Sequence, residues 1–239
     1  MILSREKKDK LSVIYLTEIG QNHQKMGIPN QDAIAYEVDG TDFVIAVSDG
    51  VGSCKKAEQG AETAVKICTS FLSRIKSGEV QFDGSCIVQS LIDEWKVSLD
   101  GNLSDYCATI KSIIKIGKKA LIISLGDGFA AITSEGMKLI SPNDETYFTN
   151  ETKCLGEKVV VADFWTKFFD IDTNMSYVIM VCTDGVANAI RQGEELTFVE
   201  EIEKSVKSDD LEEELSDFMK DISQYSFDDK TLGVVKYER

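Results

Sequence analysis

Runs of apolar residues separated by short turn-forming pairs predict a chain built mainly from β-strands. Apolar runs of about four to eight residues, bounded by glycine or aspartate, are typical of strands in a sheet. Most of the first ten residues are polar or charged, and the first predicted strand begins at residue 11. We expect strands over residues 11–19, 33–38, 42–48, 106–116, 119–125, 128–133, 136–140, 158–162, 166–171, 177–183 and 231–237.

Two stretches instead carry apolar residues at helical spacing. The first begins at Ala57 and ends near Ser77-Gly78, and the second covers residues 85–99. The links between strands are short, which favours antiparallel pairing, and the regular strand–helix alternation of a doubly wound parallel sheet is absent. The pattern predicts an α+β fold, a β-sandwich covered by helices, as a single domain over residues 1–239. Further helices are expected over residues 186–191, 196–207 and 209–223.

The charge balance narrows the class of partner. Among the 239 residues, 41 Asp and Glu stand against 26 Lys and Arg, which gives a net charge of −15. Nucleic acids and anionic membranes are polyanions, so neither is expected as a partner. Six cysteines without a Cys-x-x-Cys pair and a single histidine argue against a zinc site, and several of the cysteines stand in apolar runs as small core residues. With no visible signal peptide, we expect a reducing, cytoplasmic setting.

Two of the apolar runs end in an aspartate followed by glycine, at Asp49-Gly50 and at Asp184-Gly185. A carboxylate at the end of a buried strand is costly unless it is paired or binds a metal, and no cluster of Lys or Arg stands beside either one. Carboxylate and carbonyl oxygens suit Mg²⁺ or Mn²⁺, and two such ions about 4 Å apart support metal-assisted hydrolysis. Four more aspartates share the strand-end position and would meet at one end of a sandwich: Asp32, Asp127, Asp228 and Asp229.

An aspartate before glycine is also a common turn former, through a hydrogen bond from the backbone to its side chain. Taken alone, Asp127 and Asp229 fit that simpler role. We assign it to three pairs that lie between predicted elements, Asp39-Gly40, Asp83-Gly84 and Asp100-Gly101. What distinguishes Asp49 and Asp184 is the apolar run before each.

Five short motifs together resemble the metal-dependent Ser/Thr protein phosphatases of the PP2C type. They stand in the family's order and extend from about Gly20 to Val235. Gly20-Gln21-Asn22-His23 and the Pro-x-Gln-Asp-Ala segment further resemble a bacterial branch of the family. The five motifs are Asn30-Gln31-Asp32-Ala33, Ser48-Asp49-Gly50-Val51-Gly52, Leu125-Gly126-Asp127, Cys182-Thr183-Asp184-Gly185-Val186 and Asp228-Asp229-Lys230-Thr231.

The resemblance implies a four-layer αββα sandwich of two mainly antiparallel sheets, with a two-metal site between them. Asp49 would bridge two Mn²⁺ or Mg²⁺ ions, the Gly50 carbonyl would bind one of them, and Asp184 and Asp228 would complete its ligands. Where the family has Asn-Glu-Asp, this chain has Asn30-Gln31-Asp32, so the second ion would rely on Asp32 and on the Gln31 amide oxygen. Asp127 would help to hold a third ion, and residues 141–158 fall where the family carries a variable flap.

The substrate side departs from the family pattern. Many members place an arginine four residues before the acidic motif, where this chain has Gly27, and some keep a histidine after Asp49-Gly50, where it has Val51. His23 is the candidate that would contact the phosphate instead, with Lys25 as an alternative. Lys55 and Lys56 supply positive charge nearby or a solvated helix start.

The function that these residues imply is hydrolysis of phosphoserine or phosphothreonine in proteins by a metal-activated water. The expected partners are phosphorylated substrate proteins, including a Ser/Thr kinase or its targets, and the chain is expected to be a monomer. The alternative is a catalytically weak phosphatase-like module that binds phosphoproteins or regulates a partner. A haloacid-dehalogenase-type reading of residues 170–174 is a poor fit, because that motif lies late in an antiparallel region.

Overall fold

The computed structural model describes residues 1–8, 10–142, 153–205 and 211–239 and folds them into two antiparallel sheets. The six-stranded sheet has the order β1-β2-β11-β10-β7-β8, and the five-stranded sheet has the order β3-β4-β5-β6-β9. Every strand pairs antiparallel with its neighbours in the sheet. The strands of the first sheet are β1 (Ile2–Lys8), β2 (Leu11–Glu18), β7 (Phe129–Ser134), β8 (Met137–Ile140), β10 (Tyr177–Cys182) and β11 (Lys230–Tyr237). Those of the second are β3 (Asp32–Asp39), β4 (Asp42–Asp49), β5 (Ile110–Ile116), β6 (Lys119–Leu125) and β9 (Trp165–Asp170).

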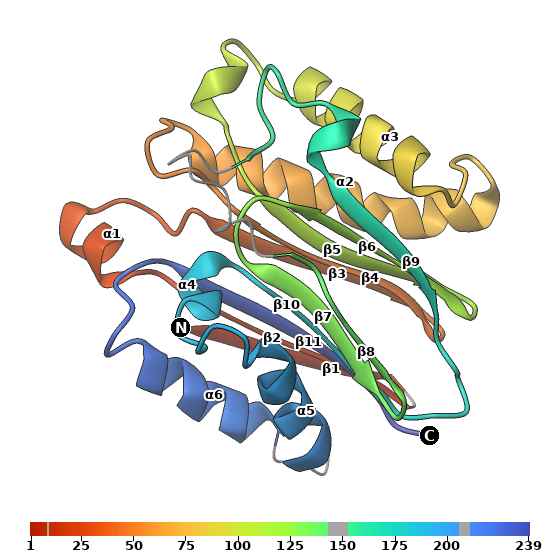
Figure 1. Ribbon diagram of the computed structural model, residues 1–239. Helices are drawn as coiled ribbons and strands as arrows, with labels where there is room; N and C mark the ends of the chain where they lie inside the picture. The colour runs from red at the N-terminus through yellow and green to blue at the C-terminus, as the bar shows by residue number, and fades with distance from the viewer. Residues whose placement is uncertain (9, 143–152, 206–210) are drawn as a thin grey trace.

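Helices cover the outer face of each sheet, which makes the four-layer αββα arrangement that was predicted (Figure 1). The long helices α2 (Ala57–Ser77) and α3 (Gly84–Val97) pack on the five-stranded sheet, and α5 (Glu195–Ser205) and α6 (Leu211–Ile222) pack on the six-stranded sheet. The short helices α1 (Gln21–Met26) and α4 (Asp184–Ala187) lie at one end of the sandwich (Figure 1). None of the helices in the described ranges is long and apolar enough to cross a membrane.

Three apolar cores separate these four layers, and strand β4 shows why its sequence is apolar throughout. Phe43, Ile45 and Val47 face the other sheet, whereas Val44 and Ala46 face the helices. Successive side chains of a strand point to opposite faces, so a strand buried on both faces has no polar positions to alternate. The polar end of this strand, at Asp49, is therefore the exception that needs an explanation.

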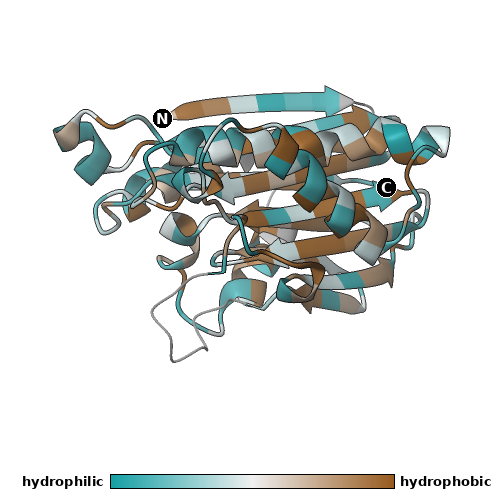
Figure 2. Ribbon diagram, turned by 90° about the horizontal axis from the view of Figure 1, so that it is seen from above, coloured by the Kyte–Doolittle hydropathy of each residue, from teal (hydrophilic) through white to brown (hydrophobic). Residues whose placement is uncertain are grey.

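Several predicted elements differ from the structure. Strand β1 was not predicted, because only its first residues are apolar; it is an edge strand and hydrophilic over most of its length (Figure 2). Helix α1 lies in a segment that the sequence marks only as rich in turns. The strand predicted over 158–162 is wrong: the chain forms the short 3₁₀ helix η3 (Val161–Asp163), because the Asp163 carboxylate accepts a hydrogen bond from the Val160 N–H.

Three boundaries also move. β5 begins at Ile110 and not at residue 106, after the 3₁₀ helix η1 (Leu103–Asp105). Helix α4 begins at Asp184, and the helix expected over 85–99 ends at Val97. Most of the predicted flap, residues 143–152, lies outside the described residues; in its later part Leu155 is buried and pairs with Ala108.

Candidate metal centre

The open end of the β3–β4 hairpin brings two predicted ligands together. Asp32 and Asp49 stand directly opposite each other in the register of the two strands. The Gly50 N–H donates to the Gln31 carbonyl at 3.1 Å, which continues the pairing beyond the strands. On the other side of Asp49, its carbonyl accepts a hydrogen bond from the Thr109 N–H at 2.8 Å. Both aspartates are thus held by backbone bonds at the rim of the five-stranded sheet.

Thr183 joins this rim to the six-stranded sheet. Its hydroxyl donates to a carboxylate oxygen of Asp32 at 2.8 Å and accepts from the Thr231 N–H at 3.0 Å. Asp184 follows it as the first residue of α4, and its charge acts on both Asp32 and Asp49. The glycine after Asp184 is required by space, because a Cβ at Gly185 would stand 1.9 Å from the Asp229 carbonyl oxygen. The two Asp-Gly junctions of the sequence therefore meet at one end of the sandwich, as predicted.

The adjacent residues Asp228 and Asp229 have different surroundings. Asp228 is exposed and close enough to Asp49 to affect its pKa. Asp229 is 3% exposed and accepts hydrogen bonds from the Gly20 N–H at 2.6 Å and the Gln31 N–H at 2.7 Å. The oxygen that accepts from Gln31 also lies 2.8 Å from Nδ1 of His23.

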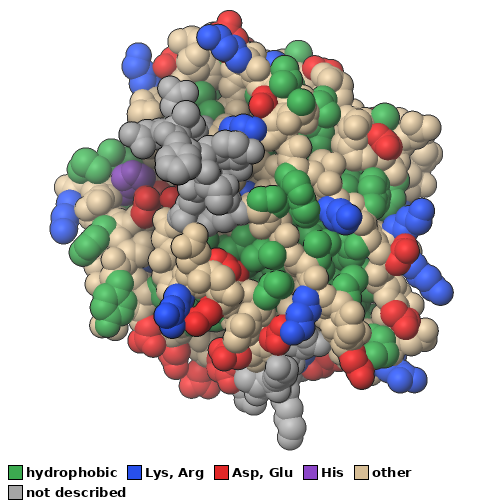
Figure 3. Space-filling view, in the orientation of Figure 1, with side chains coloured by type: hydrophobic (Ala, Val, Ile, Leu, Met, Phe, Trp, Pro, Cys, Tyr) green, Lys and Arg blue, Asp and Glu red, His purple; other side chains and the backbone are tan. Residues whose placement is uncertain are grey.

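Asp229 is thus a buried anchor for the segment from Gly20 to Gln31, and the sequence analysis missed this role. Nothing in its local sequence distinguishes it from a turn aspartate, since its partners come from α1 and the start of β3. His23 is not an exposed loop residue, because its side chain is 14% exposed and bonded to Asp229. Figure 3 shows the histidine at the surface beside acidic side chains.

The aspartates of the site are negatively charged groups held close together, and their charges raise the pKa values of Asp32 and Asp49. Burial raises the pKa of Asp49 well above its usual range, and the charges of Asp32, Asp184 and Asp228 raise it further. The pKa of Asp32 rises to about 7, chiefly through burial and also through Asp229 and Asp184, although the hydrogen bond from Thr183 opposes the shift. Like charges at short range disfavour ionisation of one another, and a cation between them reverses that effect.

Among the described residues, four buried side-chain oxygen atoms have no hydrogen-bond partner, and two of them belong to this site: Oε1 of Gln31 and Oδ1 of Asp32. A buried oxygen without a donor is costly, and a hard divalent cation would satisfy both atoms. Within the described part of the chain, no three Asp, Glu, His or Cys side chains already stand together at metal-binding spacing. The available donor set is therefore mixed: carboxylates together with the Gln31 amide and the Gly50 carbonyl, which fits an ion that also keeps several waters.

Asp127 lies in the glycine-flanked turn between β6 and β7. It lies half-buried between Gly126 and Gly128, whose φ angles of +79° and +85° place them in the left-handed region that favours glycine. The ammonium of the buried Lys111 donates to the Gly126 carbonyl and, at 2.6 Å, to the Ser124 hydroxyl. In the haloacid-dehalogenase-type motif of residues 170–174, the Asp172 carboxylate accepts a hydrogen bond from the Asn174 N–H at 2.9 Å, as in a turn.

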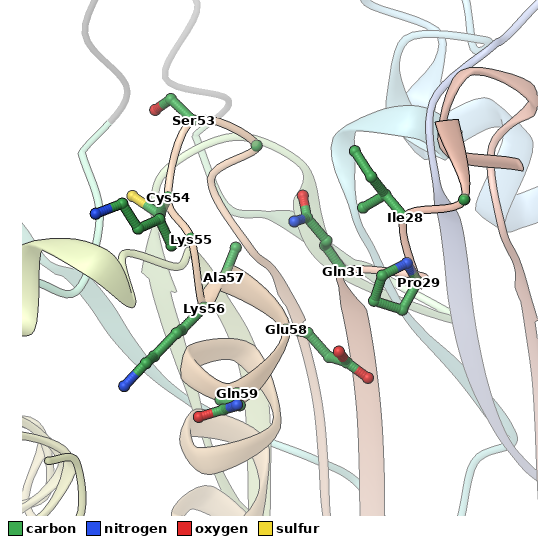
Figure 4. A pocket seen from close by; sticks show the side chains of 12 residues that line it. Ile28, Pro29, Gln31, Ser53, Cys54, Lys55, Lys56, Ala57, Glu58 and Gln59 are labelled. Carbon is green, nitrogen blue, oxygen red and sulfur yellow. The ribbon is translucent and has the colours of Figure 1, made fainter. Parts of the chain in front are cut away.

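A cavity of about 400 Å³ opens beside the acidic group. One wall is the segment from Gly27 to Gln31, and the other is the segment from Gly52 to Gln59 at the start of α2 (Figure 4). Gly27, at the position where the family often has arginine, lines this cavity and leaves it open. Lys56 is bonded to the Tyr106 hydroxyl at 2.6 Å, and Figure 4 shows the ammonium groups of Lys55 and Lys56 turned away from Gln31.

Comparison with known proteins identifies the fold. The crystal structure of a bacterial serine phosphatase has a TM-score of 0.68 at 15% identity, covering 95% of this chain and 97% of that one. RsbX in complex with magnesium has a TM-score of 0.62 at 14% identity, covering 99% and 100%. The catalytic domain of the serine threonine protein phosphatase PstP, in complex with two manganese ions, has a TM-score of 0.65 at 14% identity, covering 95% and 99%.

At these identities the solved structures establish a shared fold, and the sequence match establishes the family. No curated protein sequence matches the chain significantly. The family model of protein phosphatase 2C, however, matches residues 19–220. This match confirms the family and the enzyme class that the five motifs predicted. The chain belongs to the protein phosphatase 2C family.

Proposed function

We propose that this chain hydrolyses phosphoserine or phosphothreonine in proteins with the aid of bound Mn²⁺ or Mg²⁺. The observation that carries the proposal is the group of aspartates at the mouth between the two sheets. Asp32 is buried there and Asp49 is half-buried, and the charges that raise their pKa values belong to other aspartates. Such a group of carboxylates does not stabilise the fold, but it is what the binding of divalent cations requires.

The proposed ligands follow the positions of these residues. Asp49 and the Gly50 carbonyl would hold the ions from the five-stranded sheet, and Asp184 and Asp228 would hold one of them from the other sheet. Asp32 and Gln31, each with an unpartnered buried oxygen, would serve the second ion. Bound divalent ions supply a water of lowered pKa and polarise the phosphoryl group. Asp127, with Asp184, is the candidate pair for a third ion.

Other residues of the chain orient these groups. Thr183 fixes one oxygen of Asp32 by its hydrogen bond at 2.8 Å and leaves the other oxygen for an ion. Asp229 holds the loop that carries Gln31 and orients the ring of His23 through Nδ1. Nε2 of His23 is then the ring nitrogen left for a substrate phosphate, which is the contact we propose for it.

The cavity beside the group suits a polypeptide substrate. Its walls come from two separate segments, and the left-handed Gly27 presents no side chain to it. We propose that it accepts the residues next to the phosphorylated one. The partners would then be phosphoproteins, including a Ser/Thr kinase or its targets. A cytoplasmic monomer is our working proposal, and it fits six cysteines that form no disulfide.

The rival is a module that binds phosphoproteins without hydrolysing them. It is favoured by Gly27 in place of arginine and by the neutral Gln31 in place of a carboxylate. Phosphate release from phosphoserine and phosphothreonine peptides, measured with Mn²⁺, Mg²⁺ or EDTA, separates the two readings. We expect turnover that depends on metal and disappears in Asp184→Asn. Turnover in EDTA contradicts the metal-dependent mechanism, and metal binding without turnover on any phosphopeptide supports the binding module.

A further inference from the structure

Three cysteines that are far apart in the sequence lie together beside the metal-binding loop. The thiols of Cys54 and Cys107 both donate to the Ser104 carbonyl, with sulfur–oxygen distances of 3.2 and 3.7 Å. The Cys107 thiol also interacts with the thiols of Cys54 and Cys154. The cysteines are scattered in the sequence, and Cys68 and Cys182 are buried core residues as expected, but these three form a group that the spacing of the sequence does not reveal.

Backbone hydrogen bonds on both sides of Cys107 hold this group in place. The Cys107 carbonyl accepts from the Val51 N–H at 2.8 Å, and the Cys54 N–H donates to the Val51 carbonyl at 2.8 Å. On the other side, the Leu155 N–H donates to the Ala108 carbonyl at 2.7 Å, which places Cys154 next to the same strand. The thiols meet because three backbone segments are paired there. Since the folded chain already holds the thiols close together, a disulfide between two of them would cost little further chain entropy.

The surroundings of Cys54 and Cys107 give them different chemical roles. Cys54 is partly exposed and lies on the wall of the cavity opposite Gln31 (Figure 4). Burial, with Cys154 and Cys54 nearby, raises the pKa of the Cys107 thiol to about 12. Cys54 is the thiol that a solute reaches first. Cys107 is placed to resolve an oxidised Cys54 because the two thiols are in contact, and it would react through the small fraction that is thiolate.

We propose that Cys54 and Cys107 form a reversible oxidation site for peroxides. The Cys54 sulfur attacks a peroxide oxygen, the O–O bond breaks, and the products are a Cys54 sulfenic acid and water or an alcohol. The Cys107 sulfur then displaces the sulfenic hydroxyl, which leaves as a second water, and a disulfide forms. In total two thiols lose two electrons and two protons, and the peroxide is reduced by two electrons.

The disulfide would act on the metal-binding loop itself. Cys54 follows the ligands Asp49 and Gly50 by only a few residues and forms part of the cavity wall. A bond to Cys107 fixes this wall to the segment before β5, and small displacements of an active site cost catalysis heavily. We expect oxidation to lower kcat/KM on a phosphopeptide by at least about fivefold, and dithiothreitol to restore it.

The test separates formation of the bond from its effect on activity. The reduced full chain is treated with hydrogen peroxide in EDTA, so that no metal ion takes part, and the peroxide is removed. Digestion and mass spectrometry are expected to find a Cys54–Cys107 peptide pair two hydrogens lighter than the reduced pair. Activity with added metal is then compared before and after oxidation within each variant. Wild type and Cys86→Ser, which alters an exposed cysteine outside the group, are expected to lose activity, while Cys54→Ser and Cys107→Ser keep their own starting level.

Several results would overturn the proposal. They are a linked pair that does not contain both Cys54 and Cys107, overoxidation of Cys54 without any linked pair, or equal loss of activity in wild type and Cys107→Ser. Formation of the disulfide does not depend on the proposed phosphatase reaction. If the reduced protein is inactive on every phosphopeptide, the mass measurement still decides whether the oxidation site exists.

Discussion

The two ends of the β3–β4 hairpin carry the same residue type and hold it in opposite ways. At the turn end, the ammonium of Lys76 lies 2.5 Å from an oxygen of Asp39 and 3.2 Å from an oxygen of Asp42. The buried Lys115 stands 3.7 Å from Asp42 on its other side. At the open end, Asp32 and Asp49 face each other, and the charges that act on them are those of further aspartates.

This difference separates carboxylates that are paired within the structure from carboxylates that we propose as metal ligands. Asp42 also accepts a hydrogen bond from the Gly117 N–H at 2.8 Å, so each of its oxygens has a cation or a donor. Asp32 retains a buried oxygen with no partner. A paired carboxylate contributes to stability, whereas an unpaired buried one reduces stability unless a ligand completes it. The residue type at a strand end does not show whether an aspartate is paired or unpaired. The groups that surround its carboxylate in the structure do.

The largest expected effect comes from Asp49→Asn. We expect it to lower metal-dependent turnover of a phosphopeptide by at least about 100-fold, because an amide supplies less charge to the proposed ions than the carboxylate does. The matched control is Asp42→Asn, the same change at the other end of β4, which should stay within about twofold of wild type. Equal losses in the two variants would contradict the contrast between the hairpin ends.

The second prediction concerns stability and metal. Adding Mn²⁺ to the metal-free wild type is expected to raise the unfolding free energy, by about 2.7 kcal/mol when the ion is at 100 times its dissociation constant. Asp49→Asn should respond much less. Without metal, this variant should be more stable than wild type, because one of the repelling charges is gone. Thermal unfolding in EDTA and in Mn²⁺ measures both quantities, and a metal-free variant that is less stable than wild type would argue against repulsion at the site.

Much of the fold and most of the candidate ligands are visible in the sequence because their signals are local. Strands such as 43–47 are apolar at every position, and Asp49 and Asp184 interrupt such runs abruptly. Asp32 likewise stands at one end of a predicted strand, on the other strand of the same hairpin. These predictions needed only the assumption that strands ending at one edge of a sandwich bring their last side chains together.

What the sequence did not reveal depends on pairing between distant segments. β1 is a polar edge strand that is recognisable only beside β2. The role of Asp229 depends on N–H groups from two other segments, and the cysteine group depends on the pairing of Ala108 with both Gly50 and Leu155. The false strand at 158–162 is the opposite error, where β-branched residues suggest a strand but a single capping carboxylate, Asp163, favours a helical turn.

A third prediction tests whether Gln31, at the open end of the hairpin, is a metal ligand. Gln31→Glu restores a carboxylate beside Asp32, so we expect the Mn²⁺ concentration needed for half-maximal activity to fall by about tenfold, since one added charge strengthens cation binding. The control is Gln59→Glu, which adds the same charge to an exposed position on the opposite wall of the cavity. If both variants shift the metal requirement equally, the effect is a general one of charge, and Gln31 is not a ligand. A titration of activity against free Mn²⁺ measures it.

The smallest effects are expected at the turn end, and there the two aspartates should differ. The Asp42 side chain is 18% exposed and has two lysines and an N–H near it, so Asp42→Asn should lower the unfolding free energy by about 1–2 kcal/mol. The Asp39 side chain is 65% exposed, and solvent screens its bond to Lys76, so Asp39→Asn should cost under about 0.5 kcal/mol. Urea unfolding of both variants in EDTA measures the difference. Because neither aspartate belongs to the open end, neither variant should change the stabilisation that Mn²⁺ confers, and a reduced response in Asp42→Asn would mean that the two ends of the hairpin are coupled.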